Sequence, residues 1–167
     1  MKTCVFAGTF DPITVGHKAV IDKIINSGRR VIITVGENPE KVPFFTEDER
    51  TLMLRAAFKG NKKVRVVKYS DLKDGYAEFL NSSCVTEYYR GIRNSADYEF
   101  ERAREEKNTQ LYPGVKTVYV FLSKYAFVSS SVVRERLSKG KDVKKYIPKK
   151  AYKTFRSILD EKKRGKN

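Results

Sequence analysis

The chain has 167 residues, 40% of them hydrophobic. This allows one well-buried core and is too short for two ordinary ones. No apolar run approaches the roughly 18 residues of a membrane span, and the run at the N-terminus is too brief for a signal peptide. The formal net charge is +15, but residues 139–167 hold 12 Lys and Arg against 3 Asp and Glu. Most of the excess charge thus lies near the C-terminus, so we expect a solvated basic tail at residues 160–167 and do not favour a nucleic-acid partner.

Apolar runs and turn residues alternate along the chain in a pattern that predicts strands alternating with helices. The expected strands cover residues 3–7, 31–35, 64–69, 84–89 and 115–122. The expected helices cover residues 16–25, 47–57, 75–81, 96–111, 132–137 and 148–159. This order favours right-handed crossovers, so we expect an α/β fold: a Rossmann-like, doubly wound, parallel five-stranded sheet with helices on both faces and further C-terminal helices. One domain would span residues 1–159.

The second expected helix has a clear start signal. Thr46 and Glu49 have the Thr-x-x-Glu spacing of a capping box, directly before apolar residues at helical spacing. The two cysteines, Cys4 and Cys84, both fall in expected strands and form neither a CxxC pair nor a His/Cys cluster. We therefore expect no disulfide framework, no zinc site and a reducing, cytoplasmic location.

In sheets of this class, ligands bind beyond the carboxyl ends of the strands. The segments expected there are residues 8–17, 37–45, 90–94 and 123–131. They contain the residues most suited to binding phosphate, which are His17, Lys41, Arg90, Arg93, Ser129 and Ser130. Each has a structural alternative: the only histidine in the chain can cap or pack, a cation can be solvated or paired, and serines can be an N-cap. Together, with two helix N-termini, they predict a site for phosphoryl or nucleotidyl chemistry.

The first of these segments, GTFDPITVGH, lacks both the GxGxxG spacing and the P-loop spacing. It offers instead a glycine that permits close backbone approach, the Thr9 hydroxyl, a rigid Asp11-Pro12 turn and a helix opening at Gly16-His17. With the segments ENPEKVPFFTEDER, RGIRNSADYEFE and SKYAFVSSSVVRE, at nearly the right separations, it resembles the bacterial phosphopantetheine adenylyltransferase family. The resemblance covers about residues 3–158. Thr14–His17 is similar to the T/H-x-G-H motif of the wider nucleotidyltransferase superfamily, and the downstream segments are more specific.

The resemblance implies transfer of AMP from ATP to 4′-phosphopantetheine, giving dephospho-coenzyme A and pyrophosphate in coenzyme A biosynthesis. It implies His17, Lys41 and Arg93 as catalytic residues, with His17 on the α-phosphate. Thr9, Lys41 and Arg90 would bind phosphopantetheine. The implied ATP-binding residues are Thr9, Phe10, His17, Gly91, Ile92, Arg93, Glu101, Tyr125, Ala126, Phe127, Val128, Ser129, Ser130 and Ser131. Mg²⁺ would be held mainly by the ATP phosphates, with no protein metal ligand.

The resemblance further implies a homohexamer and feedback binding of coenzyme A. Pantetheine-pocket residues between Ser70 and Tyr89 stay unassigned, because the segment before RGIR is more polar than the family's usual aliphatic strand. Two alternatives stay open. The chain can be another small-molecule nucleotidyltransferase, acting on nicotinamide mononucleotide or glycerol phosphate, or a non-catalytic protein of this fold that binds nucleotides or nucleic acid.

Overall fold

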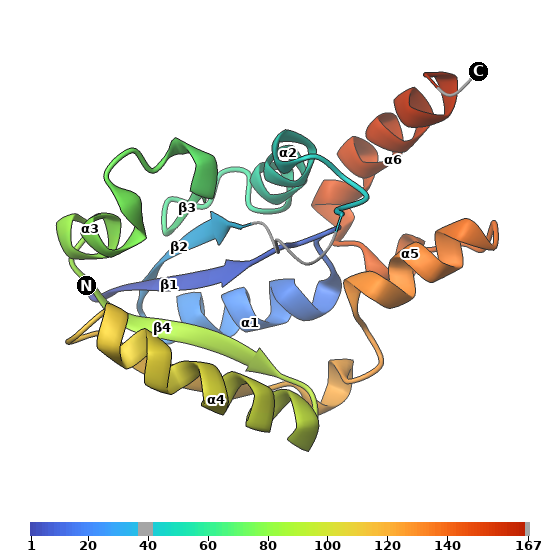
Figure 1. The fold of residues 1–167 in the computed structure, drawn as a ribbon. Coiled ribbons are helices and arrows are strands. Elements are labelled where there is room, and N and C mark those ends of the chain that lie inside the picture. The colour runs from blue at the N-terminus through green and yellow to red at the C-terminus, as the bar shows by residue number, and fades with distance from the viewer. Residues whose placement is uncertain (37–41, 166–167) are drawn as a thin grey trace.

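The computed structural model describes residues 1–36 and 42–165. Within them, five parallel strands form one sheet in the order β3-β2-β1-β4-β5 (Figure 1). The strands are β1 (Thr3–Gly8), β2 (Arg30–Val35), β3 (Val64–Lys68), β4 (Val85–Ile92) and β5 (Lys116–Phe121). The helices are α1 (Val15–Asn26), α2 (Glu47–Ala57), α3 (Gly75–Ser82), α4 (Ser95–Leu111), α5 (Ser130–Ser138) and α6 (Lys149–Arg164). The predicted α/β parallel sheet is confirmed.

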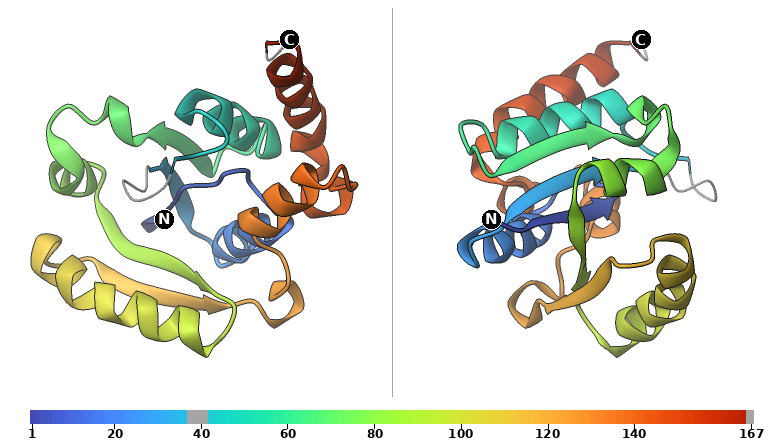
Figure 2. Two further views of the ribbon diagram at one scale, coloured as in Figure 1. Left: turned by 45° about the vertical axis from the view of Figure 1, so that its right-hand side comes forward. Right: turned by 90° about the vertical axis from the view of Figure 1, so that its left-hand side faces the viewer.

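Alternate residues of β1 face opposite sides of the sheet, as the pleat of a strand requires. Cys4 and Phe6 join a large buried cluster that takes side chains from α1, α2, α5 and α6. Val5 joins a second cluster, which includes Leu80 of α3. The two views of Figure 2 place α4 on the α3 side of the sheet. Helices therefore cover both faces, and β1 is buried on both sides, as a central parallel strand should be.

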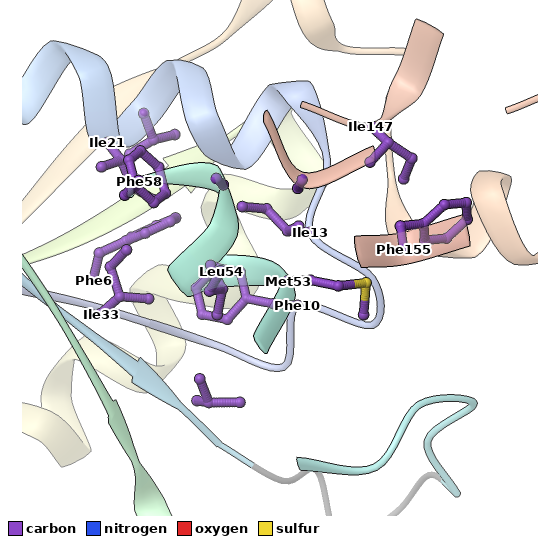
Figure 3. Close-up of a cluster of buried hydrophobic side chains, with 14 of the residues drawn as sticks. Phe6, Phe10, Ile13, Ile21, Ile33, Met53, Leu54, Phe58, Ile147 and Phe155 are labelled. Carbon is purple, nitrogen blue, oxygen red and sulfur yellow. The ribbon is translucent and has the colours of Figure 1, made fainter. Parts of the chain in front are cut away.

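The large cluster also anchors the turn between β1 and α1. Figure 3 shows Phe10 and Ile13 of this turn among side chains of β1, β2, α1, α2 and α6. Phe10 is 2% exposed and Ile13 is fully buried. A buried Phe side chain contributes about 1.5–3 kcal/mol through the hydrophobic effect. The turn is consequently part of the core and not a loose connection.

Helix α2 begins at the predicted capping box. The Thr46 hydroxyl accepts from the Glu49 N–H over 3.2 Å, and the Glu49 carboxylate accepts from the Thr46 N–H over 2.8 Å. The C-terminal helix α6 packs along α2 (Figure 1) and ends at Arg164, beyond the expected end at residue 159. Lys162 lies 2.9 Å from Glu49, and this ion pair joins the extra turn of α6 to α2.

Two predicted boundaries of β4 were wrong. The strand continues through Ile92, although Arg90 was expected to begin a turn. Pairing with β1 stops at Tyr89, whereas pairing with β5 continues to Ile92, so a neighbour distant in the sequence carries the last three residues. Cys84 precedes the strand, with φ of 51°, an exposed side chain and an N–H that donates to the Asn81 carbonyl. No helix in the described residues is long and apolar enough to cross a membrane.

Candidate active site

A cavity of about 290 Å³ lies at the carboxyl ends of β1 and β4, and residues at the start of α5 line part of it. Figure 1 shows α5 on the same side of the molecule as these strand ends. Segments far apart in the sequence meet here: the β1–α1 turn, the segment before α2, the end of β4, the first half of α4 and the start of α5. The sequence-predicted site residues that line it are Thr9, Phe10, His17, Arg90, Gly91, Arg93, Glu101, Tyr125, Val128, Ser129, Ser130 and Ser131. With Pro43 of the segment 37–45, which also lines the cavity, the fold brings residues from all four expected segments to one rim.

Three predicted site residues among those that the structure describes are not part of this lining. Ile92 is fully buried, because the extended β4 carries it into the core. Ala126 and Phe127 are exposed and do not line the cavity, and Phe127 is 66% exposed. Lys41 lies outside the described residues. The structure thus gives geometry for the turn after β1, the end of β4 and the segment after β5.

His17 is the third residue of α1 and takes part in a capping box with Thr14. The His17 N–H donates to the Thr14 hydroxyl over 3.4 Å, and the backbone N–H of Thr14 donates to Nδ1 of His17 over 3.1 Å. A backbone N–H can only donate, so Nδ1 must be the accepting nitrogen. In the neutral ring the proton is therefore on Nε2.

The surroundings of His17 favour this neutral ring. Burial and the nearby Arg93 guanidinium lower the pKa of His17 from 6.5 to about 4, and the positive end of the α1 dipole acts in the same direction. At neutral pH the side chain is thus a fixed Nε2–H donor at a cavity. The capping role and the ligand-binding role need not exclude each other, because they use different nitrogens.

The Phe10 ring packs against the imidazole of His17. The two rings meet edge-on, with centroids 5.0 Å apart, and the Phe10 backbone has φ of 51°. A Cβ added at Gly8 would lie 3.1 Å from the Phe10 Cζ, which is tighter than ordinary packing allows. Gly8 therefore makes room for the ring that packs on His17, a requirement that the sequence pattern did not reveal.

Both of the sequence-predicted arginines that line the cavity have carboxylate partners. Nε of Arg90 lies 3.2 Å from Glu101, and the Arg90 guanidinium stacks 4.4 Å above the Tyr88 ring. Nε of Arg93 lies 3.0 Å from Asp97. A planar guanidinium held by stacking or by an ion pair is pre-oriented for binding phosphate oxygens. Ion pairing, the structural alternative for these residues, is thus compatible with a place at the cavity.

The serines after β5 fix the start of α5. The Ser129 hydroxyl accepts from the Val132 N–H over 3.1 Å, so Ser129 is the N-cap. The Ser130 hydroxyl donates to the Pro12 carbonyl over 2.8 Å and ties α5 to the β1–α1 turn. The N-termini of α1 and α5 consequently open onto the same cavity, where their free N–H groups favour an anion.

A family model described as cytidylyltransferase-like matches residues 5–136. A phosphopantetheine adenylyltransferase from Heliobacterium modesticaldum is 39% identical over 149 residues, covering 89% of this chain and 87% of the relative. One from Chromobacterium violaceum is 34% identical over 166 residues, covering 96% and 99%, and one from Bacteroides thetaiotaomicron is 33% identical over 149 residues, covering 89% and 96%. The chain belongs to the phosphopantetheine adenylyltransferase family. The span that the family model matches contains every residue that lines the cavity.

In this member of the phosphopantetheine adenylyltransferase family, two charged lining residues were not among the predicted site residues, Asp11 and Arg134. Nη1 of Arg134 donates to the Asp11 carbonyl over 2.5 Å and lies 3.3 Å from its carboxylate. Asp11, 5% exposed, also accepts from the N–H groups of Phe44 and Phe45 over 2.9 and 2.8 Å. Helical spacing offered one signal, because Arg134 follows Ser130 by four residues and so shares its face of α5.

The described residues contain no group of three or more His, Cys, Asp or Glu that could hold a metal ion. Asp11 is the buried carboxylate of the cavity. Both of its oxygens accept backbone N–H groups, and Arg134 neutralises its charge. The Asp11 carboxylate is therefore occupied by contacts within the protein. The N–H donors and cations of the cavity suit an anionic ligand better than a bare metal cation.

Proposed function

We propose that this protein transfers AMP from ATP to 4′-phosphopantetheine, giving dephospho-coenzyme A and pyrophosphate. The observation that carries the proposal is the neutral His17, which is fixed as an Nε2–H donor at the cavity that Arg93 and the N-terminus of α5 also line. The names of the relatives, phosphopantetheine adenylyltransferase, support this choice of acceptor.

The proposed reaction is an in-line displacement. A phosphate oxygen of 4′-phosphopantetheine forms a bond to the α-phosphorus of ATP, and the bond from that phosphorus to the bridging oxygen of pyrophosphate breaks. The attacking phosphate is largely ionised near neutral pH, so no general base is needed. Catalysis then depends on positioning and on stabilising charge at the α-phosphate and the departing pyrophosphate.

The chain's own residues have distinct roles in this proposal. Nε2–H of His17 donates to an α-phosphate oxygen, where negative charge increases in the transition state. Arg93 and the N-terminus of α5 bind the phosphates of ATP. Arg90 and Thr9 bind the acceptor, and Lys41 keeps the role expected from the sequence. The remaining proposed nucleotide-binding residues are those of the lining: Phe10, Gly91, Glu101, Tyr125, Val128, Ser130 and Ser131, with Ser129 at the N-cap.

Magnesium enters this proposal as part of the nucleotide substrate. Bound to the ATP phosphates and water, Mg²⁺ would lower the negative charge that the cations of the cavity must balance. The proposal also includes the expectations of a cytoplasmic homohexamer and of feedback binding by coenzyme A, which rest on the family resemblance. Molecular mass in solution and inhibition by coenzyme A are their direct tests.

The experiment is a pyrophosphate-release assay with ATP, Mg²⁺ and one acceptor at a time: 4′-phosphopantetheine, nicotinamide mononucleotide or glycerol phosphate. We expect pyrophosphate with 4′-phosphopantetheine and little with the others. Folded protein that releases none with 4′-phosphopantetheine, or that prefers another acceptor, would contradict the proposal. The H17A variant, purified in the same way, controls for contaminating enzymes.

A further inference from the structure

Arg50 of α2 is fully buried, and its guanidinium reaches backbone carbonyls of three separate segments. Nη1 donates to the carbonyls of Thr9 and Gly36, both over 2.7 Å. Nε donates to the Phe45 carbonyl over 3.1 Å and to the Thr46 carbonyl over 3.3 Å. One side chain therefore joins the turn after β1, the end of β2 and the start of α2.

These segments are the ones that shape one wall of the cavity. Thr9 lines the cavity itself. The Gly36 N–H donates to the Gly8 carbonyl over 3.0 Å, and the Phe45 N–H donates to the Asp11 carboxylate. Arg50 thus completes a network in which the β1–α1 turn is held against β2 and against the approach to α2.

Filling the core does not require a charge at this position. Met53 and Leu54 on the same helix are also fully buried and are apolar. A buried guanidinium loses its hydration, and an apolar side chain of similar volume often stabilises a fold at least as well. The guanidinium contributes N–H donors at fixed angles, because its planar group donates hydrogen bonds in several directions at once. A lysine ammonium is a single point and cannot reproduce the Nε and Nη1 contacts together.

We propose that Arg50 is a positioning residue for adenylyl transfer. It acts through the Thr9 backbone, since its own side chain is not among those that line the cavity. This inference rests on the proposed function, because it concerns the same site. Displacing a substrate-contacting segment by about 1 Å can lower a rate by about 100-fold, even when binding is retained.

The test compares R50M and R50K with the wild type. We expect both variants to fold, with R50M at least as heat-stable as R50K, because methionine removes the buried charge. We expect kcat to fall about 10- to 100-fold in both, while the Kd for ATP, measured by calorimetry, stays within about threefold. The matched control is R55K, on the exposed face of the same helix, and its kcat should remain within about twofold of wild type.

A folded R50M or R50K variant with wild-type kcat would overturn the inference. Failure of both variants to fold would also overturn it, because Arg50 would then serve the fold itself. Wild-type turnover in the same assay separates this outcome from failure of the proposed function. An inactive wild type contradicts adenylyl transfer, whereas an active wild type with equally active variants contradicts only the role of Arg50.

Discussion

Nδ1 of His17 accepts a hydrogen bond from the backbone N–H of Thr14 over 3.1 Å. This bond assigns the ring proton to Nε2 and orients the imidazole. It also satisfies an N–H group at the start of α1 that would otherwise lack a helical partner. His17 therefore combines a structural role at one nitrogen with a donor at the other, and the two roles can be separated by substitution.

Asparagine and glutamine separate these roles. The asparagine of H17N would place an oxygen near the position of Nδ1 but has no atom at Nε2, and the glutamine of H17Q would do the reverse. We expect H17N to keep most of its stability and to lose about 10²- to 10³-fold in kcat, as for loss of an oxyanion donor. We expect H17Q to retain more kcat but to lose about 0.5–2 kcal/mol of stability with the cap. Steady-state kinetics and urea unfolding measure both quantities, and equal kcat losses in the two variants would contradict the assignment.

The pH dependence of His17 follows from its low pKa. Burial and Arg93 lower the pKa to about 4 in the folded protein, whereas an unfolded histidine titrates near 6.5. The unfolded chain therefore binds the extra proton first as pH falls, so the stability contribution is full above pH 6.5 and decreases towards pH 4. H17N should remove this part of the pH dependence of the unfolding free energy.

The same ring can be observed directly. His17 is the only histidine in the chain, so its imidazole signals in a nitrogen-15 NMR spectrum need no assignment. We expect the Nε2–H tautomer in the free protein, and we expect the imidazole to titrate with a midpoint near pH 4. A midpoint near 6.5, or a proton on Nδ1, would show that the Thr14 bond does not hold the ring.

Gly91 and Val20 should couple in a double-mutant cycle. A Cβ added at Gly91 would lie 3.0 Å from Cγ2 of Val20, a buried side chain of α1. We expect G91A to cost about 1–3 kcal/mol through overpacking. Combining it with V20A should cost less than the sum of the single variants, because removing Cγ2 makes room. Additive unfolding free energies would mean that the backbone shifts to relieve the contact.

The Asp11 carboxylate should matter for stability well beyond an ordinary surface charge. In D11N, one of the Phe44 and Phe45 N–H groups loses its acceptor, and Arg134 loses its counter-charge. We expect D11N to lower the unfolding free energy, measured in urea, by about 2–4 kcal/mol. The control is D22N, since Asp22 pairs with Lys18 at the surface and should cost less than about 1 kcal/mol. A similar loss in the two variants would contradict the role of Asp11.

An ion pair at the opposite end of the sheet should affect stability without affecting turnover. Arg29 donates to both carboxylate oxygens of Glu87, which is 8% exposed, and this holds the pKa of Glu87 below its usual value. The pair stabilises the fold above the ordinary glutamate pKa and loses that effect as pH falls through the lowered value. We expect E87Q to lower the unfolding free energy by about 1–3 kcal/mol, with kcat within about twofold of wild type. A large loss of kcat in folded E87Q would refute this separation.

The sequence predicted the features of the fold that depend on local patterns. The capping box at Thr46 and the alternation of apolar runs placed the strands and helices correctly. The end of β4 was predicted wrongly because Arg90 is charged, while the strand is extended by pairing with β5 about 30 residues away. Such pairing is a property of the assembled sheet and leaves no local pattern.

The candidate site follows the same division. His17, Arg93 and Ser129 could be brought together from the rule that ligands bind at the carboxyl ends of parallel strands. Asp11 and Arg50 could not, because their partners include backbone groups 14 to 41 residues away, and any residue type supplies such groups. From the sequence alone, an arginine near the start of a helix is expected at the surface. Only the packing of α2 shows that Arg50 is buried.

The most direct test of adenylyl transfer is the stoichiometry of its products. Purified protein would be incubated with ATP, Mg²⁺ and 4′-phosphopantetheine, and dephospho-coenzyme A would be quantified by mass spectrometry beside pyrophosphate. We expect the two products in equal amounts and no ADP, with both lost together in H17N. Folded, ATP-binding protein that yields no dephospho-coenzyme A, or that releases ADP instead of pyrophosphate, would contradict adenylyl transfer.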